Sequence, residues 1–255
     1  MTRRLVLIGI GPGDPEQVTL EAVRAMNEVD IVVVTEKHRP DGDPLAAARS
    51  ALLARHATPP PAVVVVEDAE RDRSPSRTED GDGYLRAVAD WHEARAQRYA
   101  AALADQPGDV GFLVWGDPAL YDSTIRVLER VAPLVGAQLV VVPGVSSLSA
   151  LAARHRIVLH EVGEPFHVTT GRRFGEAVEQ GQRTIAVLLN RSLDELRGLA
   201  PDLWDIWWGA NLGTPTEQLV AGPLSSALPE IERARELAKD AAGWVMDLYL
   251  LRRRD

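Results

Sequence analysis

The sequence of 255 residues contains no cysteine and no long apolar run. Without cysteine, disulfide bonds and thiolate metal sites are excluded. The six histidines are scattered without the HxxxH or HExxH spacing of metal ligands, so no metal site is expected. No apolar stretch approaches the roughly 20 residues that span a bilayer, and the first residues do not resemble a signal peptide. We therefore expect a cytoplasmic protein that does not associate with a membrane.

Positive charge is scarce relative to negative charge. The chain has 28 Lys and Arg against 37 Asp and Glu, which gives a formal net charge of −9. Such an acidic chain argues against a nucleic-acid partner, because nucleic acids are bound mainly through their phosphates. The hydrophobic content of 45% and the charged content of 25% are ordinary for a globular protein. The length allows one large domain or two of ordinary size.

Short apolar segments alternate with helix-like segments in the first part of the chain. Strands are expected at 5–10, 31–34, 63–66, 110–115 and 139–142, and helices at 19–27, 44–57, 84–103 and 124–135. The apolar segments lack polar alternation, as a sheet covered on both faces requires. The pattern predicts an α/β domain with a mostly parallel, doubly wound sheet, to which we assign residues 1–156.

The pattern changes after residue 143. Helices are expected at 146–154, around 176, at 193–198 and at 228–239, and strands at 166–169, 184–189, 206–208 and 243–251. The stretch HRIVLHEVGEP, which starts at residue 155, interrupts the helix pattern. These features predict a second α/β domain with a mixed sheet over residues 157–255.

The first predicted strand ends in the turn GIGPGDP, residues 9–15, which is similar to a nucleotide-binding loop. Two residues argue against phosphate binding. Pro12 removes a backbone N–H donor, and Asp14 places a carboxylate where the third glycine of GxGxxG belongs. Asp14 and Pro15 are also typical of a helix start that binds nothing. A nicotinamide-dependent oxidoreductase with a degenerate glycine loop stays open as an alternative.

Two further turns follow predicted strands, WGDPALYDST at 115–124 and PGVSS at 143–147. Taken singly, the first is a Gly-Asp-Pro turn that closes a strand, and the second is a helix N-cap. In an open parallel sheet, however, ligands bind beyond the carboxyl ends of the strands. Because all three turns are expected at this edge, together they predict one binding site.

The motifs GIGPGD, WGDPALYDST and PGVSS, in this order, resemble the signature turns of the tetrapyrrole methylase family. The resemblance implies two α/β domains of the class III methyltransferase type with the active site in the cleft between them. It also implies S-adenosylmethionine as methyl donor, a reduced tetrapyrrole as substrate, and a homodimer. S-Adenosylmethionine has no phosphate, so Pro12 and Asp14 are no obstacle to its binding.

A narrower resemblance covers nearly the whole chain. The stretches that carry it are ERDR (70–73), VADWHEAR (88–95), LVWGDPALYDSTIRVLERV (113–131), ALAARHRIVLHEVGEPFHVTTGRR (150–173) and GWVMDLYLLR (243–252). They are similar to the deacetylating precorrin methyltransferases of aerobic cobalamin biosynthesis. This branch implies methylation of ring carbon 1 of precorrin-5 with loss of the acetyl group there as acetate. A methylase of the same fold that acts at another position or on another acceptor, and an inactive scaffold, are the alternatives.

Carried over residue by residue, the resemblance assigns cofactor contacts to all three turns and to the second domain. The residues expected at S-adenosylmethionine are Pro12, Trp115, Gly116, Asp117, Leu120, Ser146, Ser147, Leu189, Ala210 and Gly243. Asp117 is the expected acceptor for the ammonium group or the ribose hydroxyls, unless it only caps its own turn. Ala210 is taken from WWGANLGTPTEQ within about two residues of register. Gly243 is expected to begin the last strand.

The implied chemistry adds two further groups of residues. Loss of the acetyl group requires water attack on a carbonyl, and hence a general base and a donor for the oxyanion. Tyr121 and Asp122 adjoin the second turn and are the expected catalytic pair. Because the substrate carries many carboxylates, we expect Arg71, Arg172 and Arg173 to bind them. Each arginine, taken singly, is equally well explained as part of a solvated surface.

Overall fold

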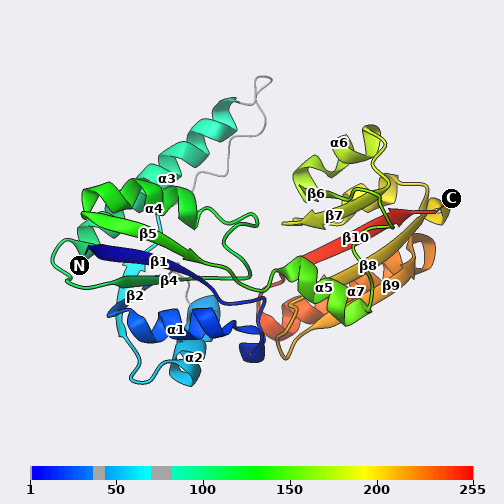
Figure 1. Ribbon diagram of the computed structural model, residues 1–255. Helices are drawn as coiled ribbons and strands as arrows, with labels where there is room; N and C mark the ends of the chain where they lie inside the picture. Colours follow the sequence, from blue (N-terminus) through cyan, green and yellow to red (C-terminus); the bar gives the residue numbers. More distant parts are fainter. Residues whose placement is uncertain (1, 37–43, 70–81, 255) are drawn as a thin grey trace. The chain divides into compact units, whose positions relative to one another are not determined.

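The computed structural model describes residues 2–36, 44–69 and 82–254 (Figure 1). The chain forms two compact units, each with a five-stranded sheet. The first unit contains Met1–Gly11 and Val18–Val145, and the second contains Pro12–Gln17 and Ser146–Asp255. Among the described residues, no helix is long and apolar enough to cross a membrane.

The sheet of the first unit is entirely parallel and confirms the predicted α/β architecture. Its strands are β1 (Arg3–Gly9), β2 (Ile31–Glu36), β3 (Ala62–Glu67), β4 (Val110–Val114) and β5 (Ala137–Val142). They lie in the order β3-β2-β4-β1-β5. The intervening helices are α1 (Leu20–Glu28), α2 (Pro44–His56), α3 (Asp82–Leu103) and α4 (Thr124–Leu134).

Helices cover both faces of this sheet, which explains why its central strands are apolar throughout. Val6, Ile8 and Val32 pack with α1 and α2, whereas their neighbours Leu7 and Val33 pack with α3 and α4. Figure 1 shows the two helix pairs on opposite faces of the sheet. Successive side chains of a strand point to opposite faces, so the central strands have no solvent-facing side that would take polar residues.

The second unit has a mixed sheet, as predicted. Its strands are β6 (His167–Thr170), β7 (Thr184–Leu188), β8 (Trp204–Ala210), β9 (Gln218–Pro223) and β10 (Asp247–Arg253), and its helices are α5 (Ser147–His155), α6 (Phe174–Glu179) and α7 (Leu224–Ala242). The strand order is β6-β7-β10-β8-β9, in which β6 and β7 are parallel and the other pairs are antiparallel. Four 3₁₀ helices occur among the described residues, at Pro15–Gln17 (η1), Gly171–Arg173 (η2), Asp194–Gly198 (η3) and Pro201–Leu203 (η4).

Two details of the second unit differ from the sequence prediction. Strand β9 was not predicted, whereas the helix expected at 193–198 is present as η3. Gly243 does not begin the last strand, which starts at Asp247. Gly243 instead terminates α7 in the left-handed conformation with φ 71°, and its N–H donates to the Lys239 carbonyl at 2.8 Å. Glycine is favoured at such a position because it has no Cβ.

The compact units divide between Val145 and Ser146, rather than after residue 156 as the sequence predicts. The reason is that α5 packs on the second sheet. A Cβ added to Gly209 of β8 would lie 2.9 Å from Leu151 Cδ1, so the helix side chain sits directly on the strand backbone. At the end of the helix, His155 Nε2 lies 2.9 Å from the Trp208 carbonyl oxygen. Helix α5 therefore belongs to the second unit.

We expect the burial of His155 to make the protein less stable in mild acid. Burial lowers the pKa of His155 below its ordinary value of 6.5, so the folded protein holds a neutral ring that donates to Trp208. The unfolded chain takes up the proton first as the pH falls, and the stabilisation, complete above pH 6.5, is lost below it. The effect is at most about 1 kcal/mol because the ring is partly solvated.

Urea unfolding of the wild type and of the His155→Gln variant at pH 7.5 and pH 5.5 measures this effect. The glutamine amide still donates to the carbonyl but does not titrate, so the variant is expected to lose less stability between the two pH values. An equal loss in both proteins would show that other groups cause the acid sensitivity.

Candidate functional site

Three turns come together at the carboxyl ends of β1, β4 and β5 in the first unit. Gly11 and Gly116 form an isolated β-bridge, in which Gly11 N–H donates to the Gly116 carbonyl at 3.2 Å and Gly116 N–H donates to the Gly11 carbonyl at 2.8 Å. Gly144, from the turn after β5, packs against Gly9 at the end of β1. The convergence predicted from the sequence is thus confirmed for the turn residues of this unit.

The close approach requires glycine at two positions. A Cβ added to Gly144 would lie 2.2 Å from the Gly116 carbonyl oxygen and 2.9 Å from Gly9 Cα. A Cβ added to Gly9 would lie 2.5 Å from Gly144 N. Both contacts involve backbone, which cannot rotate away as a side chain would. Gly116 is constrained differently, because its φ of 70° is in the left-handed region while no atom lies within 4 Å of an added Cβ.

Asp117 joins the second turn to the third. Its Oδ1 accepts from Ala119 N–H at 2.8 Å, and its Oδ2 accepts from Gly144 N–H at 2.9 Å. Both oxygens therefore accept from backbone groups, and the role of Asp117 as an acceptor for a ligand remains a prediction. Each oxygen keeps a second lone pair, so a ligand donor can still be accepted.

The residues around Asp117 differ in how far their side chains are available. Tyr121 has a left-handed backbone with φ 52° and a side chain that is 43% exposed. Asp122 Oδ1 accepts from Thr124 N–H at 2.6 Å and so caps the start of α4. Trp115 is half-buried and packs against the core shared by α1 and α2, and Leu120 is half-buried. A left-handed tyrosine is strained, and such strain is often found at functional sites.

The remaining part of the first turn belongs to the second unit and uses its amides internally. Asp14 Oδ1 accepts from Glu16 N–H at 2.9 Å, and the Asp14 carbonyl accepts from Gln17 N–H at 2.9 Å. A Cβ added to Gly13 would lie 2.6 Å from Thr214 Cγ2, so the turn packs closely against residues 212–214. A phosphate would meet a carboxylate and few free N–H groups here, as the sequence predicts.

Several of the predicted residues lie where the strands of the second sheet end, at one side of that sheet, which is called this edge below. The strand pairing places Thr170 beside Leu188 and Asp247 beside Ala210, so the ends of β6, β7 and β8 and the start of β10 share this edge. Leu189 follows β7 with φ 57° and is 61% exposed. An exposed leucine in the left-handed region is uncommon and suits a side chain that packs on an apolar ligand surface.

Ala210 reaches the same edge but faces inward. It is fully buried and belongs to the core formed by β7, β8, β10 and α7, so its side chain is not available to a ligand. The role of Ala210 as a cofactor contact remains a prediction, and it would require contact through the backbone. The backbone turns at the next residue, Asn211, which has φ 49°.

Two buried polar residues organise this edge and were not found from the sequence. Asp247, with 1% of its side chain exposed, accepts from Arg235 Nε at 2.9 Å and from Trp208 Nε1 at 3.1 Å. Burial raises the pKa of Asp247, while Arg235 and Trp208 counteract that rise. Asn211 Oδ1 accepts from Met246 N–H at 2.9 Å, and its Nδ2 donates to Thr216 Oγ1 at 3.1 Å.

Ser146 and Ser147 start helix α5. Ser146 is the N-cap, and its Oγ accepts from Ser149 N–H at 3.1 Å. Ser147 is half-buried at the first helical position. The N-cap interpretation of Ser146 is therefore confirmed, and a role of either hydroxyl at a ligand remains a prediction.

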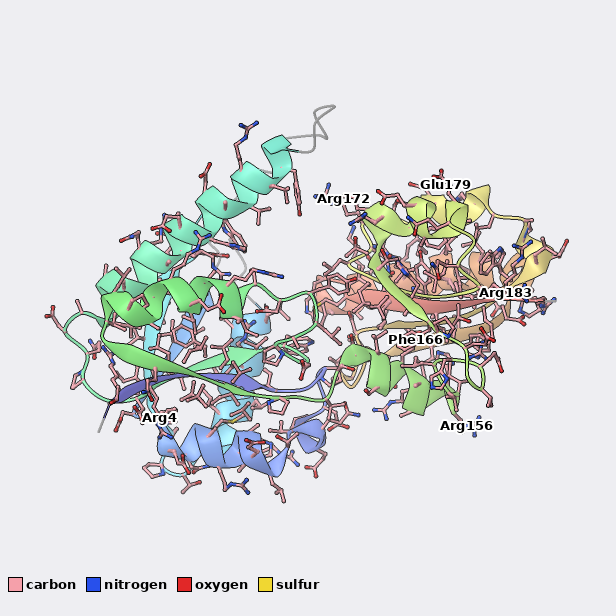
Figure 2. All side chains as sticks on the ribbon, turned by 45° about the horizontal axis from the view of Figure 1, so that its top comes forward. Arg4, Arg156, Phe166, Arg172, Glu179 and Arg183 are labelled. Carbon is pink, nitrogen blue, oxygen red and sulfur yellow. The ribbon has the colours of Figure 1, made fainter. Side chains whose placement is uncertain are left out.

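The predicted substrate-binding arginines are in different situations. Arg172 is exposed within η2, which follows β6, and Figure 2 shows its side chain at the surface of the second unit. Arg173 is 69% exposed and pairs with Glu176, with 2.8 Å between Nη2 and Oε2. Arg71 lies outside the described residues. Among the described residues, no cluster of three or more His, Cys, Asp or Glu that could hold a metal ion is found.

This geometry agrees with comparisons to known proteins. Residues 4–228 match the family model of Tetrapyrrole (Corrin/Porphyrin) Methylases. The chain belongs to the tetrapyrrole methylase family.

The chain is also similar to individual proteins. Precorrin-6A synthase [deacetylating] of Sinorhizobium sp is 39% identical, over 98% of this chain and 95% of that protein. A crystal structure of a cobalamin-synthesis-related protein (CobF) of Corynebacterium diphtheriae superposes with a TM-score of 0.80 at 31% identity, covering 99% of this chain and 100% of that one. Uroporphyrin-III C-methyltransferase of Thermus thermophilus, complexed with S-adenosylhomocysteine, has a TM-score of 0.56 at 22% identity, covers 97% of this chain and 96% of that one, and shares the fold.

Proposed function

We propose that this methylase uses S-adenosylmethionine to methylate ring carbon 1 of precorrin-5 and releases the acetyl group of that carbon as acetate, giving precorrin-6A. The observation that carries the proposal is the likeness to a deacetylating precorrin-6A synthase at 39% identity over 98% of the chain. A methylase that acts at another position of a precorrin, or on another acceptor, is the second candidate, because the fold itself does not determine the substrate.

The proposed reaction replaces one carbon substituent by another on the same ring carbon. Water adds through its oxygen to the acetyl carbonyl carbon and gives up its protons. The bond between the acetyl group and the ring then breaks, acetate leaves, and the electron pair stays on ring carbon 1. S-Adenosylmethionine supplies the methyl group to this pair and leaves as neutral S-adenosylhomocysteine. The protein must align donor and acceptor, which is worth roughly 7–11 kcal/mol in favourable cases.

The residues of the chain fit a donor that has no phosphate. The amides of Glu16 and Gln17 are paired with Asp14, and Pro12 has no N–H, so the first turn offers few of the free donors of a phosphate cradle. The second lone pairs of Asp117 can accept from an ammonium group or a ribose hydroxyl. The exposed side chain of Leu189 offers apolar surface to a ring such as adenine. Pro12, Trp115, Gly116, Leu120, Ser146, Ser147 and Gly243 remain proposed contacts of the cofactor.

The proposed catalytic and substrate-binding roles follow from the chemistry of the side chains. Tyr121 can donate its phenolic proton to a developing oxyanion, and Asp122 can accept a proton from water through the oxygen that does not cap α4. Arg172, together with Arg71 and Arg173, is proposed to bind substrate carboxylates. A homodimer in the cytoplasm is the proposed assembly, with no nucleic acid or membrane as partner.

Incubation with precorrin-5 and S-adenosylmethionine tests the proposed function. We expect one acetate to be released for each methyl group transferred. Methylation without acetate would support the second candidate instead. Titrations with S-adenosylhomocysteine and with NADH are the accompanying binding test, and binding of NADH alone would exclude a methylase.

We expect the Asp117→Ala variant to bind S-adenosylhomocysteine at least about tenfold more weakly than the wild type. The substitution removes the acceptor for two backbone N–H groups and frees the third turn from the second. Isothermal titration calorimetry gives the affinity, and thermal unfolding checks that the first unit stays folded. Asp122→Ala is the matched control, since it removes a carboxylate that caps α4 but does not link two turns. Equal affinities of the Asp117 variant and the wild type would contradict a cofactor site at this turn.

A further inference from the structure

A chain of hydrogen bonds leads from α3 to the carboxyl end of β2. Arg95 Nη2 donates to the Tyr99 hydroxyl at 2.9 Å, and the Tyr99 hydroxyl lies 2.6 Å from Thr35 Oγ1. Thr35 is half-buried, while Tyr99 is almost fully buried at 2% exposure. The three turns do not include these residues, and only Arg95 lies in a stretch that carries the family resemblance, VADWHEAR (88–95).

The direction of each hydrogen bond in this series follows from the donors that are present. A guanidinium group has no acceptor, so Arg95 must donate to Tyr99. If Thr35 also donated to Tyr99, the phenolic hydrogen would be buried without an acceptor among the described residues, which is unfavourable. Tyr99 therefore donates to Thr35, and the hydrogen of the Thr35 hydroxyl is left to point elsewhere. Among the described residues no acceptor for it is found.

Arg95 is held firmly in the position from which it donates. Its guanidinium carbon lies 4.7 Å from the centre of the Trp91 ring, and its Nε lies 3.0 Å from Asp68 Oδ1. This ion pair lacks hydrogen-bond geometry, since neither atom has a hydrogen-bond partner among the described residues. Both side chains are largely buried, at 13% and 11% exposure. A donor chain that begins at a buried charge polarises each hydroxyl along it and makes the last one a stronger donor.

The Thr35 hydroxyl stands at the part of the first sheet where a ligand is expected. The chain leaves β2 through α2 on one face and leaves β4 through α4 on the other, and ligands bind where neighbouring crossovers diverge in this way. The pairing of β2 with β4 ends at Val33 and Phe112, although β2 continues to Glu36. On its other side β4 is closed by the bridge between Gly11 and Gly116. Beyond Phe112, β4 therefore has no pairing with β2 on this side of the strand.

We propose that the Thr35 hydroxyl donates a hydrogen bond to an oxygen of the tetrapyrrole substrate, with Tyr99 and Arg95 as positioning residues behind it. This inference rests on the proposed function. Two oxygens have the required chemistry, the acetyl carbonyl, on which negative charge develops during water attack, and a peripheral carboxylate. The carbonyl is favoured because Asp68 already balances Arg95 and the exposed Glu36 and Glu67 lie on the neighbouring strand ends, so a permanent anion gains little.

Steady-state kinetics of Thr35→Val and Thr35→Ser with precorrin-5 test the proposal. Valine keeps the shape but removes the hydroxyl, and serine restores it. We expect at least about a tenfold loss of kcat/KM for Thr35→Val and near wild-type values for Thr35→Ser. A fall in kcat with unchanged KM assigns the carbonyl as acceptor, and a rise in KM with unchanged kcat assigns a carboxylate. Affinity for S-adenosylhomocysteine is expected to stay at the wild-type value in both variants. The Tm of Thr35→Val should fall modestly, because the buried Tyr99 hydroxyl loses its acceptor, whereas the Tm of Thr35→Ser should stay near wild type.

Tyr99→Phe provides the second measurement and does not depend on Thr35→Val folding well. It should change kcat and KM in the same pattern as Thr35→Val, and the double variant should lose little more than either single variant, since both break one chain. Wild-type kinetics for Thr35→Val and Tyr99→Phe would overturn the role of Thr35 while leaving the proposed function intact. A wild-type protein that does not turn over precorrin-5 would overturn the proposed function and, with it, this substrate contact.

Discussion

The Gly144→Ala variant is expected to lose about 2–3 kcal/mol of its free energy of unfolding and at least about tenfold in affinity for S-adenosylhomocysteine. The added methyl group would lie 2.2 Å from the Gly116 carbonyl oxygen, far inside the contact distance of the two atoms. Because Gly9 backbone closes the other side, the third turn can only move away from the first two. Residues that bind a ligand together must be held within a few tenths of an ångström, so this movement weakens the site as well as the fold.

Gly136→Ala is the matched control for this experiment. Gly136 has φ 63°, but no atom lies within 4 Å of an added Cβ, so the substitution costs only the backbone strain of about 1 kcal/mol. It also directly precedes β5, at the opposite end of the strand from the turn, and should leave the affinity unchanged. Native affinity in the Gly144 variant, measured by calorimetry, would show that the three turns do not form the cofactor site.

The fold of the first unit was largely predictable because burial on both faces makes its strands visible in the sequence as apolar segments. Strands covered on both faces contain few polar residues, and β1, β2 and β4 therefore stand out as apolar runs. Strand β9 does not form such an apolar segment. It lies at the edge of the second sheet, its residues are only partly buried or exposed, and it contains a glycine and a proline. Short segments of this kind are not distinguished from loops by their pattern.

The division into units was harder to predict than the elements themselves. Helix α5 follows the last strand of the first sheet after only the short turn of residues 143–146, so the sequence suggests that it completes that domain. Only the contacts of Leu151 and His155 with β8 show that it belongs to the second unit. The same holds for residues 12–17, which pack on residues 212–214 although the chain returns at once to the first unit. Such long-range contacts have no local signature.

The residues of the candidate site were likewise predictable only where their role depends on local sequence and not on long-range contacts. The glycines of the three turns were identifiable because close backbone contact or a left-handed backbone favours glycine at these positions. Asp247 and Asn211 were not, because an isolated aspartate or asparagine in the sequence is typical of a surface position. A lone acidic residue within the apolar stretch VMDLYLL was the one available signal. Its partners Arg235 and Trp208 come from other elements, and their identity required the structure.

We expect the Asp247→Ala variant to lose about 3 kcal/mol of its free energy of unfolding. The carboxylate is almost completely buried, and its removal leaves the guanidinium of Arg235 and the indole N–H of Trp208 without their acceptor. Removing one partner of a buried ion pair is more costly than the pair itself is stabilising, because the other charge stays desolvated. Urea unfolding followed by tryptophan fluorescence suits this test, since four of the six tryptophans, at 204, 207, 208 and 244, lie in the second unit.

Asp205→Ala is the control, because Asp205 forms an ion pair of the same type with Arg254 on the same sheet. That pair is 33% and 40% exposed, so water replaces the lost partner and the expected loss is less than about 1 kcal/mol. The loss of unfolding free energy for Asp247→Asn should lie between those of the two alanine variants. The amide oxygen accepts from one of the two donors but carries no charge to balance Arg235. Equal losses in the Asp247 and Asp205 alanine variants would mean that solvent reaches Asp247 despite its burial, and that this edge of the second sheet is not organised around a buried charge.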